Sequence, residues 1–301
     1  MADDRVVWLN GELIPWGEAT VPLLSHGFSR ASGIFEAFGS HESPDGPVAF
    51  RMDEHLKRLR HSADMLEMEL GFSEEEIGAG VAETVRANNV GRGLIKIMAY
   101  WSEEAPIKLV LDAKLDIAIF AIPAEAGLPL DDATAISACL SSWRKLHPET
   151  AQVTAKACAN YLNAYLVRKE AQKRGFDVAF LLGTDGFLAE GTTESVFLVK
   201  DGALKTPPLG RILSSISRLS LLEMAPTIGI SVEETLLQAD DLFTADEIFT
   251  AHTGVKVHPV NRFEDRELEA PGPVSTRLME LMDDVLHFRN RQFGHFFQSL
   301  A

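Results

Sequence analysis

One lysine stands among small, uncharged residues in the stretch Thr154-Ala155-Lys156-Ala157-Cys158-Ala159-Asn160-Tyr161-Leu162-Asn163. A lysine amine is a nucleophile only in its neutral form, and desolvation among small apolar neighbours lowers the pKa of such an amine. The pattern therefore indicates a lysine that forms a Schiff base with a carbonyl compound. A solvated cation before a helix is the commoner role of a lysine, and these ten residues alone leave that alternative open.

The composition of the chain limits the classes of protein to which it can belong. A length of 301 residues suggests two domains, at roughly 150 residues per domain. The formal net charge of −16 argues against a nucleic-acid-binding protein, which needs a basic face. No apolar run reaches the roughly 18 residues of a membrane span, and the N-terminus lacks the pattern of a secretory signal. Cys139 and Cys158 make neither a disulfide framework nor a zinc site. From these features together we expect no metal, no membrane contact and a cytoplasmic location.

Hydrophobic patterns predict a first part made of strands with a pair of helices. A hairpin is predicted at 6–15 around the turn Asn10-Gly11. Asp53 is the expected N-cap of one helix, and Ser73 with Glu76 forms a capping box for a second helix that ends near residue 88. Further strands are predicted at 34–38, 48–51, 94–100 and 116–122.

The second part begins after a predicted linker at 123–132, which is rich in Pro, Gly and Asp. We therefore predict an N-terminal domain at 1–122 and a C-terminal domain at 133–301. A helix follows Lys156 and ends at Gly175, another is expected to begin at Ser217, and a long terminal helix is predicted at 274–296. The strands predicted in this part are 135–140, 178–182, 187–189, 196–199, 204–206, 230–233, 247–250 and 255–260.

Five motifs in the expected order resemble those of the class IV (fold-type IV) pyridoxal-phosphate-dependent aminotransferases. They are Phe50-Arg51 with His55-Leu56 and Arg58-Leu59, Lys156 with Asn160-Tyr161-Leu162-Asn163, Glu190-Gly191 with the residues to Phe197, Leu213-Ser214-Ser215-Ile216-Ser217-Arg218, and 249–260 with Thr253. The match runs from about residue 26 to 260 and looks closest to the branched-chain amino acid aminotransferases. It implies an α+β, D-amino acid aminotransferase-like fold, with a small α/β N-terminal domain and a β-rich pseudobarrel C-terminal domain that binds pyridoxal 5'-phosphate.

The resemblance also implies roles for individual residues. Lys156 would form the Schiff base and carry a proton, and Glu190 would face the pyridine nitrogen and keep the ring an electron sink. Tyr161 would hydrogen-bond the phenolic oxygen of the ring. The cofactor's phosphate would be held by Arg51, Ile216, Ser217 and Thr253. Taken one at a time, these residues also fit ordinary surface or helix positions, and only their joint order favours the cofactor roles.

The positions that shape the substrate pocket depart from the family's patterns. Branched-chain enzymes usually have Tyr-Ile-Arg where this chain has Leu94-Ile95-Lys96, and a tyrosine where it has Arg30. The Arg-x-His of the D-amino acid enzymes is absent from 106–109, and the Gly-Asp-Gly of the aminodeoxychorismate lyases is replaced at 31–33. We therefore predict Arg30 and Lys96 as a different carboxylate-binding pair, with Phe35 as a third substrate-binding residue. Two solvated cations are the alternative.

The resemblance as a whole predicts an aminotransferase that moves an amino group from a branched-chain-like amino acid to a 2-oxo acid such as 2-oxoglutarate. The reaction would follow a ping-pong order, and the enzyme would be a homodimer without nucleic-acid partners. Three alternatives stay open at this point. They are a D-amino acid or amine transaminase, an aminodeoxychorismate lyase of the same fold, and a binding protein that has lost catalysis.

Overall fold

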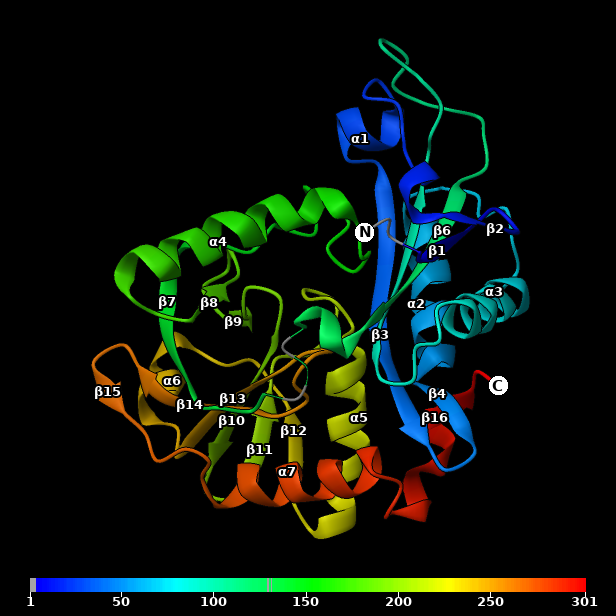
Figure 1. The fold of residues 1–301 in the computed structure, drawn as a ribbon. Coiled ribbons are helices and arrows are strands. Elements are labelled where there is room, and N and C mark those ends of the chain that lie inside the picture. Colours follow the sequence, from blue (N-terminus) through cyan, green and yellow to red (C-terminus); the bar gives the residue numbers. More distant parts are fainter. Residues whose placement is uncertain (1–3, 129, 131) are drawn as a thin grey trace. The chain divides into compact units, whose positions relative to one another are not determined.

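The computed structural model describes residues 4–128, 130 and 132–301. The contacts within the chain divide it into two compact units (Figure 1). The described residues up to Leu130 form the first unit together with Ala155–Ala159 and Gln292–Ala301, and the described residues of 131–154 form the second unit together with Asn160–Arg291. The division falls inside the predicted linker, of which residues 129 and 131 lie outside the described part. Two segments of the predicted C-terminal domain thus join the first unit, and the domain boundaries themselves stay a prediction.

A seven-stranded antiparallel sheet forms the centre of the first unit. Its strand order is β16-β4-β3-β5-β6-β1-β2. The strands are β1 (Val6–Leu9), β2 (Glu12–Pro15), β3 (Gly33–Ser43), β4 (Gly46–Phe50), β5 (Gly93–Tyr100), β6 (Asp116–Pro123) and β16 (Phe297–Ser299). The predicted hairpin is confirmed, because β1 pairs with β2 and both Asn10 and Gly11 have the positive φ angles that a two-residue turn needs.

Two long helices pack against this sheet, and α1 (His26–Arg30) precedes β3. The two are α2 (Met52–Met65), which contacts β3, and α3 (Glu74–Ala87), which contacts β1 and β6 (Figure 1). The capping box of Ser73 and Glu76 at the start of α3 is confirmed. The prediction of Asp53 as the N-cap of α2 is wrong. The cap is Arg51, whose left-handed backbone (φ 54°) ends β4 and starts the helix in a single step.

The strands of the first sheet alternate between two faces with different surroundings. In β5, Ile95, Ile97 and Ala99 are fully buried in the hydrophobic core that α2 and α3 share with the sheet. The alternate residues of the same strand, among them Lys96 and Tyr100, are half-buried. The face that carries Lys96 is therefore the one on which a site can form within this unit.

The second unit contains a nine-stranded mixed sheet, in the order β12-β11-β10-β13-β14-β7-β8-β9 with β15 paired to β14. The strands are β7 (Ile136–Arg144), β8 (Val178–Leu182), β9 (Leu188–Glu190), β10 (Ser195–Lys200), β11 (Ala203–Thr206), β12 (Val232–Glu234), β13 (Glu247–Ala251), β14 (His258–Phe263) and β15 (Arg266–Glu267). The helices are α4 (Tyr161–Arg174), α5 (Ile216–Met224), α6 (Ala239–Thr244) and α7 (Pro273–Leu286). Helix α4 packs on β7 and β8 through a small buried cluster that includes Val167 and Ala171.

The structure corrects three predicted elements of the second part. Helix α5 has Ser215 as its N-cap and begins at Ile216, so Ser217 lies one residue inside it. Strand β14 begins at His258, three residues later than predicted. The terminal helix ends at Leu286, and a 3₁₀ segment (Arg291–Phe296) and β16 follow it.

Aromatic packing in the first unit explains the early end of the terminal helix. The Phe296 ring lies 5.6 Å from that of Phe50 and 5.2 Å from that of Phe293, and all three side chains are buried. This burial is favourable enough to override the helical periodicity of the segment.

No helix in the described part of the chain is both long and apolar enough to cross a membrane.

Candidate active site

Lys156 is held by the backbone and side chains of the first unit. Its amide N–H donates to Ser62 Oγ at 2.9 Å, and its carbonyl oxygen accepts the Phe35 N–H at 3.1 Å. An isolated antiparallel bridge joins the next residue, Ala157, to Ile34. The segment around Lys156 therefore pairs with the start of β3, which fixes the point at which the lysine side chain leaves the backbone.

The amine of Lys156 lies over an aromatic ring that a second lysine shares. Lys156 Nζ is 4.7 Å from the centroid of the Phe35 ring, and Lys96 Nζ is 5.4 Å from the same centroid. The register of β3 and β5 places Lys96 and Phe35 on the same face of the sheet. Burial raises the pKa of the Cys158 thiol, and the charges of both lysines act against that shift. We call Phe35, Lys96, Lys156 and Cys158 the lysine cluster.

An apolar cavity of about 270 Å³ borders the lysine cluster. Cys158 lines it, together with Phe28, Met98, Tyr100 and Phe120. Burial raises the pKa of Tyr100, so its phenol stays protonated and neutral at physiological pH. A cavity of this size and lining accepts an aliphatic or aromatic side chain.

The two predicted anion-binding arginines of the first unit have different surroundings. Arg51 is buried, and its guanidinium carbon lies 4.0 Å from the centroid of the Phe296 ring. Arg30 ends α1, and its guanidinium donates to the carbonyl oxygens of Ala105 (2.8 Å) and Pro106 (3.1 Å). In the described part of the chain, no hydrogen bond, ion pair or ring contact joins Arg30 to Lys96. The structure therefore brings Lys96 to Lys156, whereas Arg30 holds a loop.

Glu190 lies at the end of β9 in the second unit, with both carboxylate oxygens engaged. The ammonium group of Lys145 pairs with Oε1, and the Leu213 N–H lies 3.4 Å from Oε2. Both charged side chains are 13% exposed. The amide contact is long, so Oε2 keeps capacity for a stronger donor. A protonated ring nitrogen is such a donor.

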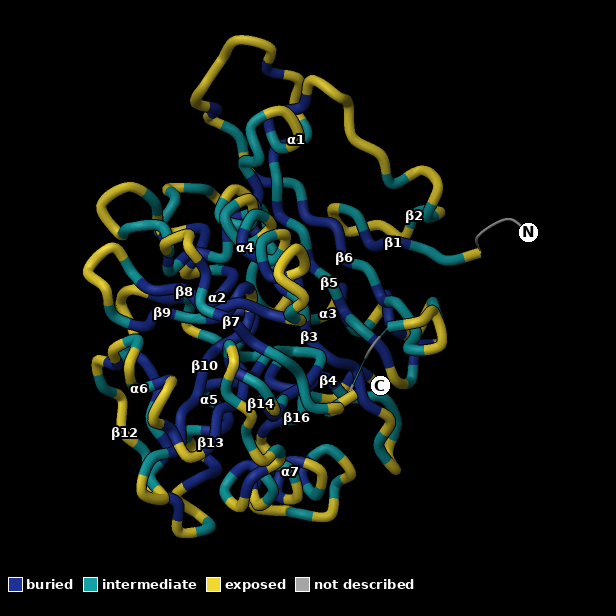
Figure 2. The backbone as a smooth tube through the Cα atoms, turned by 90° about the vertical axis from the view of Figure 1, so that its left-hand side faces the viewer, coloured by how far each residue is buried: buried dark blue, intermediate teal, exposed yellow. Residues whose placement is uncertain are grey.

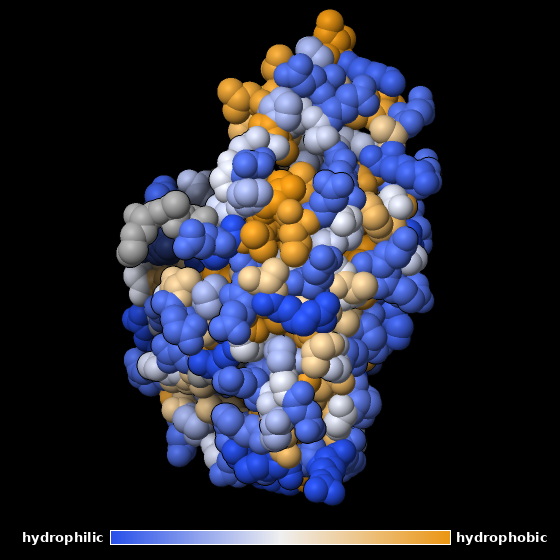
Figure 3. All heavy atoms as spheres, turned by 45° about the vertical axis from the view of Figure 1, so that its right-hand side comes forward, coloured by the Kyte–Doolittle hydropathy of each residue, from blue (hydrophilic) through white to orange (hydrophobic). Residues whose placement is uncertain are grey.

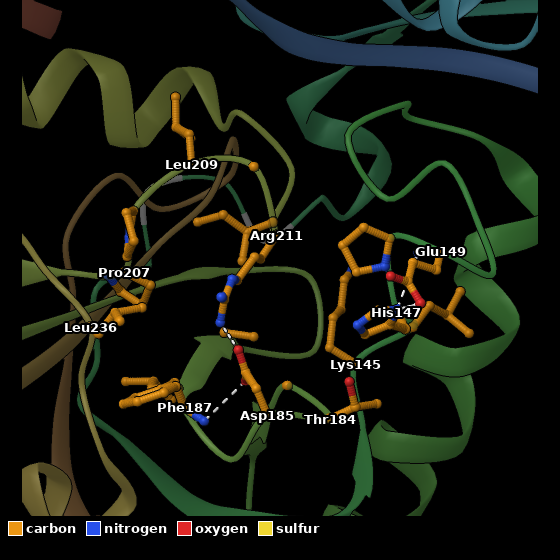
Figure 4. Close-up of a pocket in the computed structure, with 18 residues that line it drawn as sticks. Lys145, His147, Glu149, Thr184, Asp185, Phe187, Pro207, Leu209, Arg211 and Leu236 are labelled. Atoms are coloured by element: carbon orange, nitrogen blue, oxygen red, sulfur yellow. Dashed lines mark hydrogen bonds and ion pairs between the residues drawn. The ribbon is translucent and has the colours of Figure 1, made fainter.

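Lys145 also lines a cavity of about 430 Å³ in the second unit (Figure 4). Arg211 points toward Asp185 in this cavity and forms an ion pair with it, and Asp185 Oδ1 accepts the Phe187 N–H at 3.2 Å. On the opposite side of Figure 4, His147 and Glu149 lie next to Lys145. The cavity therefore gives Lys145 access to water while its ammonium group stays on Glu190.

The predicted phosphate donors lie at two backbone turns of the second unit. Ile216 and Ser217 are the first two residues of α5, where helix geometry leaves amide N–H groups without intrahelical acceptors. Thr253 follows β13, and its carbonyl oxygen accepts the Lys256 ammonium group. His252 Nδ1 accepts the Gly254 N–H at 3.1 Å, and burial lowers the pKa of His252 to about 4, so the ring is a neutral acceptor. The first turn of α5 can therefore present amide donors to an anion.

Tyr161 is the first residue of α4 and is half-buried.

The described residues contain no group of three or more His, Cys, Asp or Glu side chains that could hold a metal ion.

A family model described as amino-transferase class IV matches residues 33–263. The chain belongs to the class IV aminotransferases. It is 31% identical to the branched-chain-amino-acid aminotransferase of Pseudomonas aeruginosa over 290 residues, which are 95% of this chain and 94% of that protein. These matches confirm the resemblance seen in the five motifs.

Solved structures of this class share the fold. A branched-chain aminotransferase of Thermoproteus uzoniensis with norvaline superposes with a TM-score of 0.93 at 31% identity, covering 99% of each chain. The branched-chain amino acid aminotransferase of Thermobaculum terrenum in its PLP form gives a TM-score of 0.92 at 29% identity, covering 100% of each chain. The predicted fold class is confirmed. Class IV aminotransferases depend on pyridoxal phosphate, so the predicted enzyme class and cofactor are confirmed as well.

The residues present fit pyridoxal phosphate by their chemistry. Lys156 supplies a primary amine for the aldehyde, and Glu190 supplies a half-buried carboxylate with a weakly used oxygen for the ring nitrogen. The first-turn amides of α5 and the buried guanidinium of Arg51 suit a phosphate. Each of these groups is chemically compatible with the part of pyridoxal phosphate that it would bind.

Sequence reasoning missed Lys145, the cation that pairs with Glu190. The two residues are 45 positions apart and meet because β7 pairs with β8 and β8 with β9. Periodicity and spacing carry no information about such a long-range contact.

Proposed function

We propose that this aminotransferase moves the amino group of a branched-chain or similar aliphatic L-amino acid to a 2-oxo acid such as 2-oxoglutarate. The observation that carries the proposal is the apolar cavity of about 270 Å³, which borders the lysine cluster through Cys158. An amino acid bound at Lys156 would place an apolar side chain in this cavity without burying an unpaired polar group. The relatives named above, which are branched-chain enzymes, support the same substrate class.

Bound pyridoxal phosphate supplies an aldehyde that takes up the amino group and a ring that withdraws electrons from the substrate. In our proposal the Lys156 amine attaches the cofactor and then carries a proton between substrate and cofactor atoms. Oε2 of the Glu190 carboxylate faces the ring nitrogen, while Lys145 holds Oε1. Tyr161 hydrogen-bonds the ring oxygen. Arg51, Ile216, Ser217 and Thr253 bind the phosphate.

Lys96 is the group that we propose for the substrate's carboxylate. It shares the Phe35 ring with Lys156, so a carboxylate near the reacting amine meets a second ammonium group. The Phe35 ring contacts both ammonium groups. Arg30 stays a predicted member of this pair, and a substrate carboxylate would have to compete with the carbonyl oxygens that its guanidinium now binds.

We also propose a homodimer, which an exposed apolar patch of the first unit supports. Its most exposed side chains are Leu23 (77%), Phe28 (65%), Ile107 (91%), Leu109 (73%) and Val110 (69%). The two segments that carry them are joined, because His26 Nε2 bonds the Leu109 carbonyl oxygen at 2.9 Å. Figure 2 shows the loop beside α1 as mostly exposed, and Figure 3 shows hydrophobic atoms at the top of its view. Exposed apolar surface of this kind marks an interaction site. Light scattering of the purified protein should therefore give a molar mass twice that of the 33.0 kDa chain.

A panel of amino donors in paired enantiomers tests the substrate. The purified enzyme is supplied with pyridoxal phosphate and 2-oxoglutarate, and the 2-oxo acid products are quantified. We expect L-leucine, L-isoleucine, L-valine and L-norvaline to be the best donors, and Lys96→Ala to raise their KM more than it lowers kcat. Lys57→Ala, which removes an exposed lysine of α2, is the matched control.

The same panel decides between the proposal and its rivals. A preference for D-amino acids or amines would overturn the substrate assignment. Release of pyruvate from aminodeoxychorismate without an acceptor would indicate a lyase. An unchanged KM in Lys96→Ala would remove Lys96 from the substrate site.

A further inference from the structure

A buried hydroxyl group joins Lys156 to helix α2. Ser62 is 0% exposed, and its Oγ accepts the Lys156 N–H at 2.9 Å. The same hydroxyl donates to the Arg58 carbonyl oxygen at 2.8 Å, one helical turn earlier. Because the hydroxyl proton points to Arg58, the oxygen's lone pairs face the lysine amide.

The turn of α2 that carries Ser62 is anchored to β3 by a buried charge network. Arg58 donates to both carboxylate oxygens of Glu36, from Nε to Oε1 and from Nη2 to Oε2, each at 2.7 Å. His55 Nδ1 lies 2.6 Å from Glu36 Oε2. His55, Arg58 and Ser62 follow one another at intervals of three and four residues, so they lie along one face of α2.

Strand β3 holds the other side of the lysine backbone. Glu36 takes the bonds of Arg58, and its neighbour Phe35 donates its N–H to the Lys156 carbonyl oxygen. Ser62 lies one helical turn after Arg58, and Phe35 lies next to Glu36. Both of these hydrogen bonds on the Lys156 backbone therefore come from residues close to the Glu36–Arg58 ion pair. A change in the spacing of α2 and β3 would therefore move Lys156.

The network keeps one charge state at neutral pH. Burial acts to raise the pKa of Glu36, but the charge and hydrogen bonds of Arg58 and His55 outweigh it and lower that pKa to about 2. Burial lowers the pKa of His55 to about 4. Both shifts keep the charges of the pair fixed near pH 7, which suits a network that anchors the lysine segment.

We propose that Ser62 is a positioning residue for Lys156, and that the Glu36–Arg58 pair holds the turn of α2 from which Ser62 acts. The inference rests on the proposed function, in which Lys156 attaches the cofactor. Loss of the Ser62 hydroxyl removes this acceptor from the Lys156 amide N–H, and the segment stays attached through Phe35 and the Ile34–Ala157 bridge. The lysine then samples positions from which its amine reaches the aldehyde less often.

The test compares two buried serine or threonine hydroxyls of the first unit. Thr84 is also 0% exposed, and its hydroxyl donates to the Gly80 carbonyl oxygen at 2.6 Å, a bond that stays within α3. Ser62→Ala and Thr84→Val each remove one such hydroxyl. For each variant, apo-protein is mixed with pyridoxal phosphate, and the rate of covalent attachment is followed by absorbance and by borohydride trapping.

We expect Ser62→Ala to lower the attachment rate and kcat by about tenfold to a hundredfold, with KM for the donor changed by less than about threefold. Thr84→Val should keep the wild-type attachment rate at a similar thermal midpoint. Ser62→Thr, which retains the hydroxyl, should restore most of the rate. Should Ser62→Ala fail to fold, Ser62→Cys replaces it, because a thiol has nearly the same size and is a poor acceptor.

Two outcomes separate the inference from the function on which it rests. If the wild-type enzyme attaches cofactor at Lys156 but Ser62→Ala matches Thr84→Val in rate, the role of Ser62 is overturned and the proposed function stands. If the wild-type enzyme attaches no cofactor at Lys156, both are overturned.

Discussion

Glu36 in β3 and Glu190 in β9 are both paired with a cation, yet their surroundings differ. Glu36 is 0% exposed and accepts three short bonds, two from Arg58 and one from His55. Glu190 is 13% exposed and pairs with Lys145, and the other hydrogen bond that it accepts within the described residues is the long one from the Leu213 amide, at 3.4 Å. Both oxygens of the first carboxylate accept short hydrogen bonds, whereas Oε2 of the second accepts a long one.

This difference separates a carboxylate that serves the fold from one that, in our proposal, binds the cofactor. A buried carboxylate without partners is costly, so Glu36 can stabilise the fold only because both of its oxygens accept short hydrogen bonds. A carboxylate that must bind a cofactor's ring nitrogen needs an oxygen that is still available. Glu190 has such an oxygen in Oε2, next to the segment that leads into α5.

The largest expected effect is the loss of stability in Glu36→Gln. The substitution leaves the Arg58 guanidinium buried without its counter-charge, which costs about 3–5 kcal/mol for buried pairs. Urea unfolding of the apo-protein measures this change. Lys57→Gln, which breaks an exposed pair with Glu54 on the same helix, is the control and should leave the midpoint unchanged. An equally small effect in Glu36→Gln would mean that the network does not stabilise the fold.

Glu190→Gln should have the opposite profile. The amide cannot supply a charge to the ring nitrogen, so kcat should fall by about 10²–10³-fold, as for the loss of other electrostatic contacts in active sites. The urea midpoint should change far less than in Glu36→Gln, because the side chain is partly open to water. Steady-state kinetics with the best donor checks the first expectation. A variant that keeps its kcat would show that Glu190 does not act on the cofactor.

The pH dependence of stability sharpens the contrast on the Glu36 side. The pKa of His55 is lowered from 6.5 to about 4, so between these values the unfolded chain binds a proton that the folded chain does not. The unfolding free energy therefore falls with decreasing pH by about 1.4 kcal/mol per pH unit and per proton. Glu36 acts in the same direction between pH 4.5 and about 2.

His55→Gln should remove the upper part of this loss. Its unfolding free energy should fall less steeply than that of the wild type between pH 6.5 and 4, while the fall below pH 4.5 should remain. His252, whose pKa burial also lowers to about 4, keeps part of the slope in the upper window. Urea titrations at a series of pH values provide the measurement, and equal slopes in both proteins would contradict the buried, neutral state of His55.

The smallest expected effect is that of Lys145→Met. Without its ammonium group, Glu190 loses the contact that orients Oε1, and we expect pyridoxal phosphate to bind about tenfold more weakly, or about 1.4 kcal/mol. Lys145→Arg keeps the charge and should bind the cofactor nearly as the wild type does. Absorbance titration of the apo-proteins measures the dissociation constants. Identical constants for wild type and Lys145→Met would show that Glu190 does not depend on its cation.

Local sequence signals predicted those features that local chemistry decides. The turn at Asn10-Gly11, the capping box at Ser73 and the end of α4 at Gly175, which has φ 79°, all depend on a few neighbouring residues. The terminal helix was overextended, because the burial of Phe296 against Phe50 is a tertiary effect. Asp53 lost the cap position to Arg51 because the chain has to turn from β4 directly into α2.

The candidate site shows the same limit. The order of its motifs indicated the family, and Lys156, Phe35 and Lys96 do meet in the structure. Ser62 and Lys145 contact the proposed cofactor-binding residues Lys156 and Glu190, lie far from them in the sequence and follow no periodic pattern. Such supporting contacts become visible only once the strands are paired.

The most direct test of the central claim is to map the covalently modified lysine. The enzyme with bound pyridoxal phosphate is reduced with borohydride and digested, and the peptides are sequenced by mass spectrometry. We predict that the phosphopyridoxyl group is found on Lys156. Modification of Lys96 or Lys145 in its place, or a chain that carries no such group after reduction, would contradict the account.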